Sequence, residues 1–541
     1  MKLRRLLGAG LAVVLALSTV ACGGASESSA PVVDESASAE EKMEAAGVQT
    51  PNTETENTQK TDEQVVIQLG SYPDYFWHPG AGQSGANEEQ IINAALLDRL
   101  VDYDEATAEV KPMLAESWET DGQSFTFHLR SGVKMTDGSE LTADDVVYSA
   151  NVWKEQCASN DTGKYIESVE KVDDMTVTIK FNCVAPEILK MLTWANFGIV
   201  SEDEINAVGG LEAASQNPVM GSGKYKFKEA KTGEYVILER NEDYWDTSYN
   251  GYFKEIKFTF VNDSNAAVSA VMSGDAAVAY QMPVAQSGTF ASNPDVRTYI
   301  YSNGEVEHLF FNMGEDHPTS DIKVRQGLAK ALDYNAIAQV ATAGFGKQSY
   351  SYTNAKATYY VADYTEEERT RNVEEAKALL AEAGYDDSNP LHITTVTLPD
   401  LLELYTVIQA NLAEAGVELE IQQVDMGGFV PAMLFDKSYD IAAIGDDTTM
   451  RTPQLPQFVS PGMVFGGPNA VLEDHMDILN RLMAASDDEA SAILTEYDNQ
   501  LKEDCVAVNL YDAFQSTIVG KDIKGFAIRE RGYIDVTTLY K

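Results

Sequence analysis

An aromatic cluster is the first group of residues in this chain that could hold a ligand. It lies in a polar, glycine-flanked segment and consists of Tyr72, Tyr75, Phe76, Trp77 and His78. Aromatic faces can stack on a sugar, a peptide side chain or a cation. The alternative is that the rings anchor the segment to its own domain. Tyr75, Phe76, Trp77 and His78 are therefore candidate ligand-binding residues.

Two further segments carry candidate side chains. Residues 445–451 read Gly-Asp-Asp-Thr-Thr-Met-Arg, and Asp446 or Asp447 could form a charge-assisted hydrogen bond with an ammonium group. Arg451 could meet a carboxylate, although a solvated acidic turn is the alternative for the whole segment. Residues 193–197 offer Trp194 and Asn196, for which packing is the alternative.

The sequence gives little support to catalysis or to a metal site. It contains no GxSxG elbow and no HExxH helix. The 6 histidines are scattered, and none has the spacing of metal ligands. With 85 acidic residues, carboxylate pairs occur everywhere and carry no information. We therefore expect a protein that is not an enzyme and that has no cofactor and no metal.

The first 22 residues have the features of an export signal. A basic start precedes an apolar run, residues 6–17, that is too short to span a bilayer stably. Thr19-Val20-Ala21-Cys22 then resembles the lipobox of bacterial lipoproteins, in which the cysteine is diacylated and becomes the mature N-terminus. The resemblance implies a signal peptide over 1–21 and a lipid anchor on Cys22, because two acyl chains hold a protein stably. An ordinary signal peptide that is cut nearby is the alternative.

The segment after Cys22 has the composition of a tether. Residues 23–64 are rich in Ser, Ala, Glu, Thr and Asn and almost lack large apolar residues. Such a stretch cannot bury enough apolar area to offset its ordering entropy. We expect a disordered acidic linker over 22–64 that does not pack on the folded part, with at most a marginal helix near residues 40–46.

Charge and length restrict the remaining possibilities. The formal net charge is −46, which argues against a nucleic-acid partner because phosphate binding needs clustered Lys and Arg. The same charge repels an anionic membrane surface, so the membrane contact should be through lipid alone. Residues 65–541 are too long for one core and contain no long apolar span. Besides Cys22, the cysteines leave two possibilities open, a Cys157–Cys183 disulfide or reduced buried thiols.

The chain alternates strand and helix patterns, which indicates the α/β class. Period-two patterns predict strands over 65–69, 124–130, 174–181, 235–238 and 255–261. Helix start and stop signals predict helices from Thr142, over 372–384 and over 401–415.

Five segments together resemble the family 5 solute-binding proteins of ABC importers, which bind peptides, nickel chelates and some sugars. In the family's order, the segments are 114–147, 221–275, 311–333, 376–385 and 439–445. The resemblance implies a two-lobed periplasmic-binding-protein fold of type II, with a hinge between lobes and an extra inserted subdomain. Lobe I would comprise 65–306 and 511–541, with the subdomain over about 85–218, and lobe II would comprise 307–510.

The resemblance also implies a function. A monomeric lipoprotein on the outer face of the bacterial membrane, or in the periplasmic space if the host has an outer membrane, would capture a solute between its lobes. It would deliver this solute to a permease powered by a separate ATPase subunit. In peptide-binding relatives, the region of Asp446 and Asp447 supplies an Asp that pairs with the peptide's α-amine, although relatives usually carry Trp after the preceding Gly. A short peptide is therefore the first expectation, and an oligosaccharide, a nickel chelate or a role in sensing peptides are the alternatives.

Overall fold

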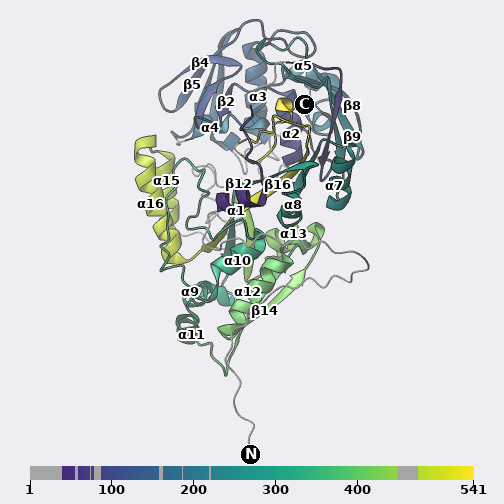
Figure 1. The fold of residues 1–541 in the computed structure, drawn as a ribbon. Coiled ribbons are helices and arrows are strands. Elements are labelled where there is room, and N and C mark those ends of the chain that lie inside the picture. The colour runs from purple at the N-terminus through teal and green to yellow at the C-terminus, as the bar shows by residue number, and fades with distance from the viewer. Residues whose placement is uncertain are drawn as a thin grey trace, which may run out of the picture.

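The computed structural model describes residues 39–54, 59–73, 75–77, 87–156, 162–184, 187–218, 221–447, 473–529 and 531–541. Figure 1 shows two bodies that meet at the centre of the molecule, where β12 and β16 lie, and the C-terminus lies in the upper one. We call the upper body lobe I and the lower body lobe II. The signal segment, Cys22 and Cys157 lie outside the described residues, so the Cys157–Cys183 disulfide stays a prediction.

A mixed sheet of eight strands runs through both lobes. Its order is β15-β12-β16-β11-β1-β10-β9-β8, with β1 parallel to both of its neighbours, β10 and β11. The strands are β1 (Gln64–Leu69), β8 (Tyr225–Lys231), β9 (Tyr235–Arg240), β10 (Glu255–Phe260), β11 (Val278–Met282), β12 (Val296–Phe311), β15 (Ile441–Asp447) and β16 (Ala507–Gly520). The alternation of buried residues along β1 confirms the strand predicted at 65–69.

The strands β12 and β16 are long because they belong to both lobes. Their pairing runs from Val296 to Ser302, is interrupted by a register shift and resumes at Val306. Gly304, within the interruption, has a φ of 87°, which residues with a side chain rarely adopt. Such an interruption bends the strands where the lobes join, and we call residues 303–305 with the facing part of β16 the hinge.

A subdomain inserted in lobe I carries its own antiparallel sheet, β4-β5-β7-β6. Its helix α3 begins as predicted, because the Asp145 carboxylate accepts hydrogen bonds from Thr142 N at 2.8 Å and Thr142 Oγ1 at 3.1 Å. Its apolar side chains are continuous with the core of lobe I. The elements of this region are α2 (Asn87–Leu96), β2 (Val101–Asp104), β3 (Glu109–Pro112), β4 (Ala115–Thr120), β5 (Ser124–Leu129), α3 (Ala143–Gln156), β6 (Ile166–Asp173), β7 (Thr176–Phe181), α4 (Ile188–Met191), α5 (Glu202–Val208) and α6 (Leu211–Ser215).

Lobe I is completed by α7 (Ser264–Ser273) and α8 (Val284–Phe290), and lobe II has separate cores of its own. The predicted helix at 372–384 is confirmed as α11, where the Asn372 side chain accepts a hydrogen bond from Glu375 N. The lobe II elements are α9 (Ile322–Ala331), α10 (Tyr334–Ala341), α11 (Val373–Glu382), β13 (Leu391–Thr397), α12 (Leu402–Glu414), β14 (Val417–Gln423), α13 (Met426–Pro431), α15 (Glu473–Met483) and α16 (Asp487–Asp504). The residue boundaries of the lobes stay a prediction.

The N-terminal segment corrects the sequence analysis. Residues 39–46 form α1 (Ala39–Ala46), and residues 47–54 run along lobe I, so the prediction of a linker free of the folded part is wrong for this stretch. Gln49 N donates to Thr298 O on β12 at 2.7 Å, and Asn52 exchanges two hydrogen bonds with Ile528. Glu54 pairs with Arg297 at 2.6 Å. The stretch docks through backbone and polar groups, which its lack of large apolar residues does not prevent. We call residues 39–54 the strap.

Candidate functional site

The hinge gathers acidic side chains where the two lobes meet. Glu305 and Glu307 are two residues apart on β12, so both side chains lie on the same face of the sheet. On the neighbouring strand β15, Gly445 pairs with Glu307. A Cβ on Gly445 would lie 3.1 Å from Oε2 of Glu307 and 3.5 Å from Oε2 of Glu305. The two carboxylates therefore share the space that the absent side chain of Gly445 leaves open.

Glu307 is the more buried of the two carboxylates. Its residue is only 6% exposed, and its Oε1 is a buried atom without a hydrogen-bond partner. Burial, together with repulsion by Glu305, raises the pKa of Glu307 to about 8. Glu305 is half-buried, and its Oε2 accepts a hydrogen bond from Asn303 Nδ2 at 2.6 Å. In the absence of a cation, Glu307 therefore holds its proton near neutral pH.

Further acidic groups approach the hinge from both lobes. Asp512 on β16 is half-buried, and burial raises its pKa to about 6. In lobe I, Glu88 lies in the first turn of α2 and accepts a hydrogen bond from Ser71 Oγ at 3.4 Å. Burial raises the pKa of the Tyr280 phenol most, followed by repulsion from Tyr301 and then from Glu88 and Glu305. Carboxylates of α2, β12 and β16 thus come from both sides of the hinge.

The structure separates the predicted aromatic candidates. Tyr75 is 43% exposed, whereas Phe76 and Trp77 are each 1% exposed and belong to the core of lobe I. Burial therefore corrects the expectation that Phe76 and Trp77 stack on a ligand and favours the alternative of rings that anchor their own loop. Trp194 and Asn196 are buried too, and Arg531 covers the ring of Trp194 at 4.1 Å. His78 and Arg451 lie outside the described residues.

The structure does bring Asp446 and Asp447 to the hinge. Both end β15, where Asp446 pairs with Val306 and Asp447 with Glu305. Their side chains lie outside the described part of the structure, so a role in binding stays a prediction. Sequence reasoning missed Glu305, Glu307 and Asp512. The available signal was the pair of glutamates, two residues apart, shortly before the apolar residues 309–311.

The hollows away from the hinge include two that we compare with it. One, of about 460 Å³, lies between the inserted subdomain and lobe II, and it is lined by Tyr103, Trp118, Lys190, Tyr359 and Ser486 among others. Beside it the lobes touch directly, because Val184 N donates to Met483 O at 3.1 Å and Lys190 Nζ donates to Thr358 Oγ1 at 3.2 Å. The lobes are therefore in contact on this side of the hinge.

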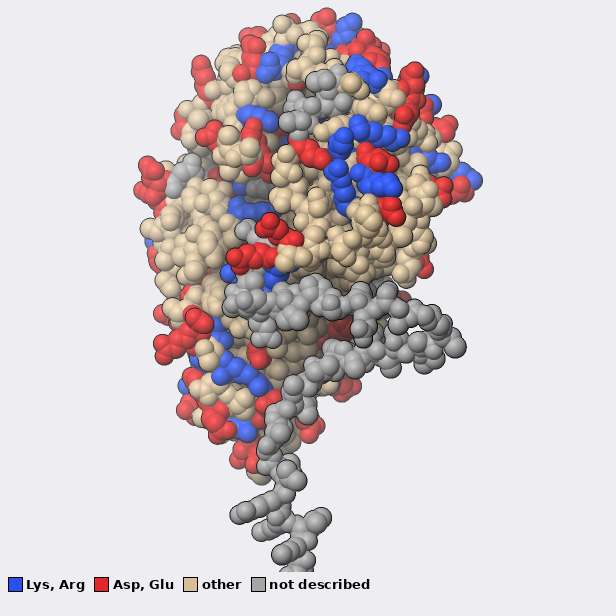
Figure 2. Space-filling model, in the orientation of Figure 1, with Lys and Arg blue, Asp and Glu red and all other residues tan. Residues whose placement is uncertain are grey.

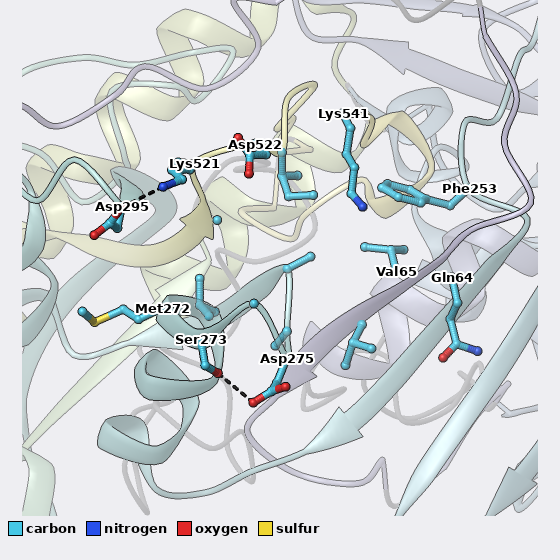
Figure 3. A pocket seen from close by; sticks show the side chains of 17 residues that line it. Gln64, Val65, Phe253, Met272, Ser273, Asp275, Asp295, Lys521, Asp522 and Lys541 are labelled. Atoms are coloured by element: carbon cyan, nitrogen blue, oxygen red, sulfur yellow. Dashed lines mark hydrogen bonds and ion pairs between the residues drawn. The ribbon is translucent and has the colours of Figure 1, made fainter.

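The other hollow, of about 380 Å³, lies within lobe I and is shown in Figure 3. Most of its charged groups are already paired, since Lys521 pairs with Asp295, Lys541 with Glu63, and Asp275 accepts a hydrogen bond from Ser273. None of the predicted site residues lines it. This hollow is therefore a poor candidate for the binding site.

Surface charge and possible metal-ligand clusters also bear on function. On the face shown in Figure 2, Lys and Arg of the upper lobe are interleaved with Asp and Glu. Within the described ranges, no cluster of three or more His, Cys, Asp or Glu has the arrangement of a metal site. None of the helices in those ranges has the length and hydropathy needed to cross a membrane.

Comparison with known proteins identifies close similarities in sequence and fold. The profile of bacterial extracellular solute-binding proteins, family 5 Middle, matches residues 109–461. Heme-binding protein A of Haemophilus influenzae is 29% identical over 62% of this chain and 64% of its own length. Oligopeptide-binding protein AppA of Bacillus subtilis is 29% identical over 60% of this chain and 63% of its own. The chain thus matches slightly less than two thirds of the length of either relative.

Solved structures show the same fold. The substrate-binding protein CtaP of an ABC transporter from Listeria monocytogenes has a TM-score of 0.77 at 23% identity, covering 89% of this chain and 99% of CtaP. AppA of Bacillus subtilis in complex with a nonapeptide has a TM-score of 0.73 at 23% identity, covering 89% of this chain and 99% of AppA. The two-lobed α/β architecture predicted from the sequence is confirmed.

Proposed function

Because the chain belongs to the bacterial extracellular solute-binding proteins of family 5, we propose that it captures a short peptide between its lobes and delivers it to an ABC permease. The observation that carries the proposal is the hinge, where only β12 and β16 of the eight-stranded sheet continue from one lobe into the other. Relatives with an oligopeptide or a dipeptide in their names support a peptide as the solute.

The mechanism follows from the hinge geometry. A solute that touches both lobes binds the closed arrangement more tightly than the open one, and it shifts the population toward closure by that difference in affinity. The register interruption near Gly304 lets the lobes rotate with few hydrogen bonds to break. The permease then recognises the closed form, and ATP is hydrolysed by a separate subunit. The protein itself changes no bond of the solute.

A lipid on Cys22 would keep the protein at the outer face of the membrane. The support is the lipobox-like sequence, since residue 22 lies outside the described residues. The variant Cys22→Ser should appear in the medium or stay unprocessed. Normal processing and membrane retention of that variant would contradict the lipid anchor.

An oligosaccharide ligand has less support than a peptide. The aromatic loop was its main argument, and two of that loop's rings, Phe76 and Trp77, are buried in the core. A role in sensing peptides rather than importing them would use the same site and the same closure.

The proposal is tested by incubating the protein with an equimolar library of peptides of two to five residues and identifying retained peptides by native mass spectrometry. A retained peptide should also reduce the radius of gyration in small-angle scattering and raise the melting temperature by mass action. Retention of sugars but no peptides would overturn the peptide proposal. Release of a chemically altered ligand would contradict the proposal that the protein changes no bond of the solute.

A further inference from the structure

We infer that Glu305 and Glu307 receive a positively charged group of the bound solute, an ammonium or a guanidinium, at the hinge. The inference rests on the proposed function and specifies the ligand class within it, a peptide with a basic side chain.

The first support is the unsatisfied state of Glu307. Its Oε1 is buried without a hydrogen-bond partner, in a residue that is 94% shielded from solvent. Leaving a buried carboxyl oxygen unpaired costs free energy, so folded proteins rarely retain one without a reason. A cationic donor from a ligand would satisfy that oxygen.

The second support is the charge around it. The charged group that most affects Glu307 is another carboxylate, Glu305. The phenols of Tyr405 on α12 and Tyr511 on β16 also lie near Glu307. Burial is the largest cause that raises the pKa of each phenol, and the charge of Glu307 raises it further. On β15, Gly445 pairs with Glu307, and the side chains of Asp446 and Asp447 lie outside the described part of the structure. A negative, partly dry site of this kind favours a cation.

The third support is position. Glu305 lies in the interruption between the lobes, and Glu307 starts the lobe II part of β12. Glu88, on the lobe I side, acts on the same phenol, Tyr280, as Glu305 does. A cation held here would lie where the lobe I and lobe II parts of β12 join, which is the position required of a ligand that stabilises closure.

Binding should therefore release a proton. Glu307 is protonated near neutral pH when no cation is present, and an adjacent cation lowers its pKa so that the carboxylate forms. Affinity for a basic peptide should consequently rise between about pH 6 and pH 8. A neutral peptide should show little change over the same range.

The test compares tripeptides Ala-Lys-Ala and Ala-norleucine-Ala by calorimetry, with the peptide library as a second readout. Wild type should bind the lysine peptide about 30-fold or more tightly than the norleucine peptide. The double change Glu305→Gln, Glu307→Gln should remove most of that preference. Calorimetry in phosphate and in Tris at pH 7 should report proton release for wild type alone.

The matched control is Glu204→Gln. Glu204 is also buried, also has an unpartnered carboxyl oxygen and also has a pKa raised to about 8, first by burial and then by Asp137. It lies on α5 in the inserted subdomain, far from β12 in Figure 1. This variant should keep the preference for lysine.

The outcomes separate the two claims. Peptide binding with no preference for lysine, or an equal preference in the double variant, overturns this inference and leaves the proposed function standing. A loss of preference in Glu204→Gln as well would assign the effect to overall charge and overturn it too. No binding by any library peptide overturns both claims.

Discussion

Lobe I and the hinge both bury carboxylates, but they surround them with opposite charges. In lobe I, Asp102 pairs with Arg99 at 2.8 Å and also with Arg529. Burial alone would raise the pKa of Asp102, but the guanidinium groups of Arg529 and Arg99 outweigh burial and hold it below its usual range. At the hinge, Glu307 faces another carboxylate, and its pKa rises.

The comparison distinguishes Asp102, whose charge is paired within the chain, from Glu307, whose charge is not. The ion pairs of Asp102 join β2 to the C-terminal residues of lobe I, and they are complete within the chain. Glu307 contributes nothing comparable, because no cation of its own chain is among the groups that shift its pKa. The effect of a buried carboxylate on stability therefore depends on its partners. Asp102 stabilises the fold, whereas Glu307 lowers its stability.

The largest expected effect tests the structural side of this comparison. Asp102→Asn should destabilise the protein by about 3–5 kcal/mol, because it removes the anion of the buried Arg99 and leaves Arg529 with only the longer contacts to Glu105 and Asp535. Because the native pKa of Asp102 is lowered, wild type keeps this stabilisation above about pH 4 and loses it as the pH falls further. The variant should have a shallower acid limb in urea unfolding.

A suitable control is Asp295→Asn, whose partner Lys521 is exposed. Its unfolding midpoint should hardly move, since exposed pairs are screened by solvent. Equal shifts in the two variants would show that the Asp102 pairs have no special structural importance.

The next effect tests the hinge side. Glu307→Gln should stabilise the unliganded protein, and more so at pH 8 than at pH 5. The native pKa of about 8 lies above that of the unfolded chain, so the native state holds an extra proton between about pH 4.5 and pH 8, and wild-type stability falls as the pH rises through that range. The gain at pH 8 should be roughly 2–4 kcal/mol. Urea unfolding at both pH values measures it, and a variant less stable than wild type at pH 8 would mean that Glu307 is already satisfied.

The smallest effect concerns the strap, whose contacts are polar and mostly uncharged. Asn52→Ala removes the two hydrogen bonds with Ile528 and should cost about 1–2 kcal/mol. Deletion of residues 39–54 should lower the melting temperature by several degrees, whereas a linker that does not pack on the lobes would leave it unchanged. An unchanged melting temperature after the deletion would restore the interpretation of a linker that does not pack.

Many helices and strands could be predicted from the sequence because each is determined by residues within or next to it. The strand β1 follows from alternating apolar residues, and α11 follows from the Asn372 cap and Gly384 at its end. The docking of the strap could not be predicted in the same way. Its hydrogen bonds join residues far apart in sequence, such as Asn52 and Ile528, and leave no pattern in composition.

The candidate site was predicted in part. The segment of Asp446 and Asp447 was identified from its place in the family pattern, and pairing of β15 with β12 brings it to the hinge. Packing and ligand contact were both left open for the rings of Phe76, Trp77 and Trp194, because a loop sequence does not state which side chains turn inward. Glu307 was missed because the environment that raises its pKa is assembled from β12, β15, β16 and α12, which only the tertiary structure brings together.

The strap changes how far the protein could travel from its membrane. If Cys22 carries lipid, the path from the anchor to the folded body ends at Ala39 rather than at Gln64. An extended chain spans at most about 3.5 Å per residue, so the maximum reach falls from about 150 Å to about 60 Å. By the usual scaling with linker length, the local concentration of the lobes around a permease in the same membrane rises about fourfold. The docked strap would thus shorten the distance that the lobes can reach from the anchor and increase the frequency of their encounters with the transporter.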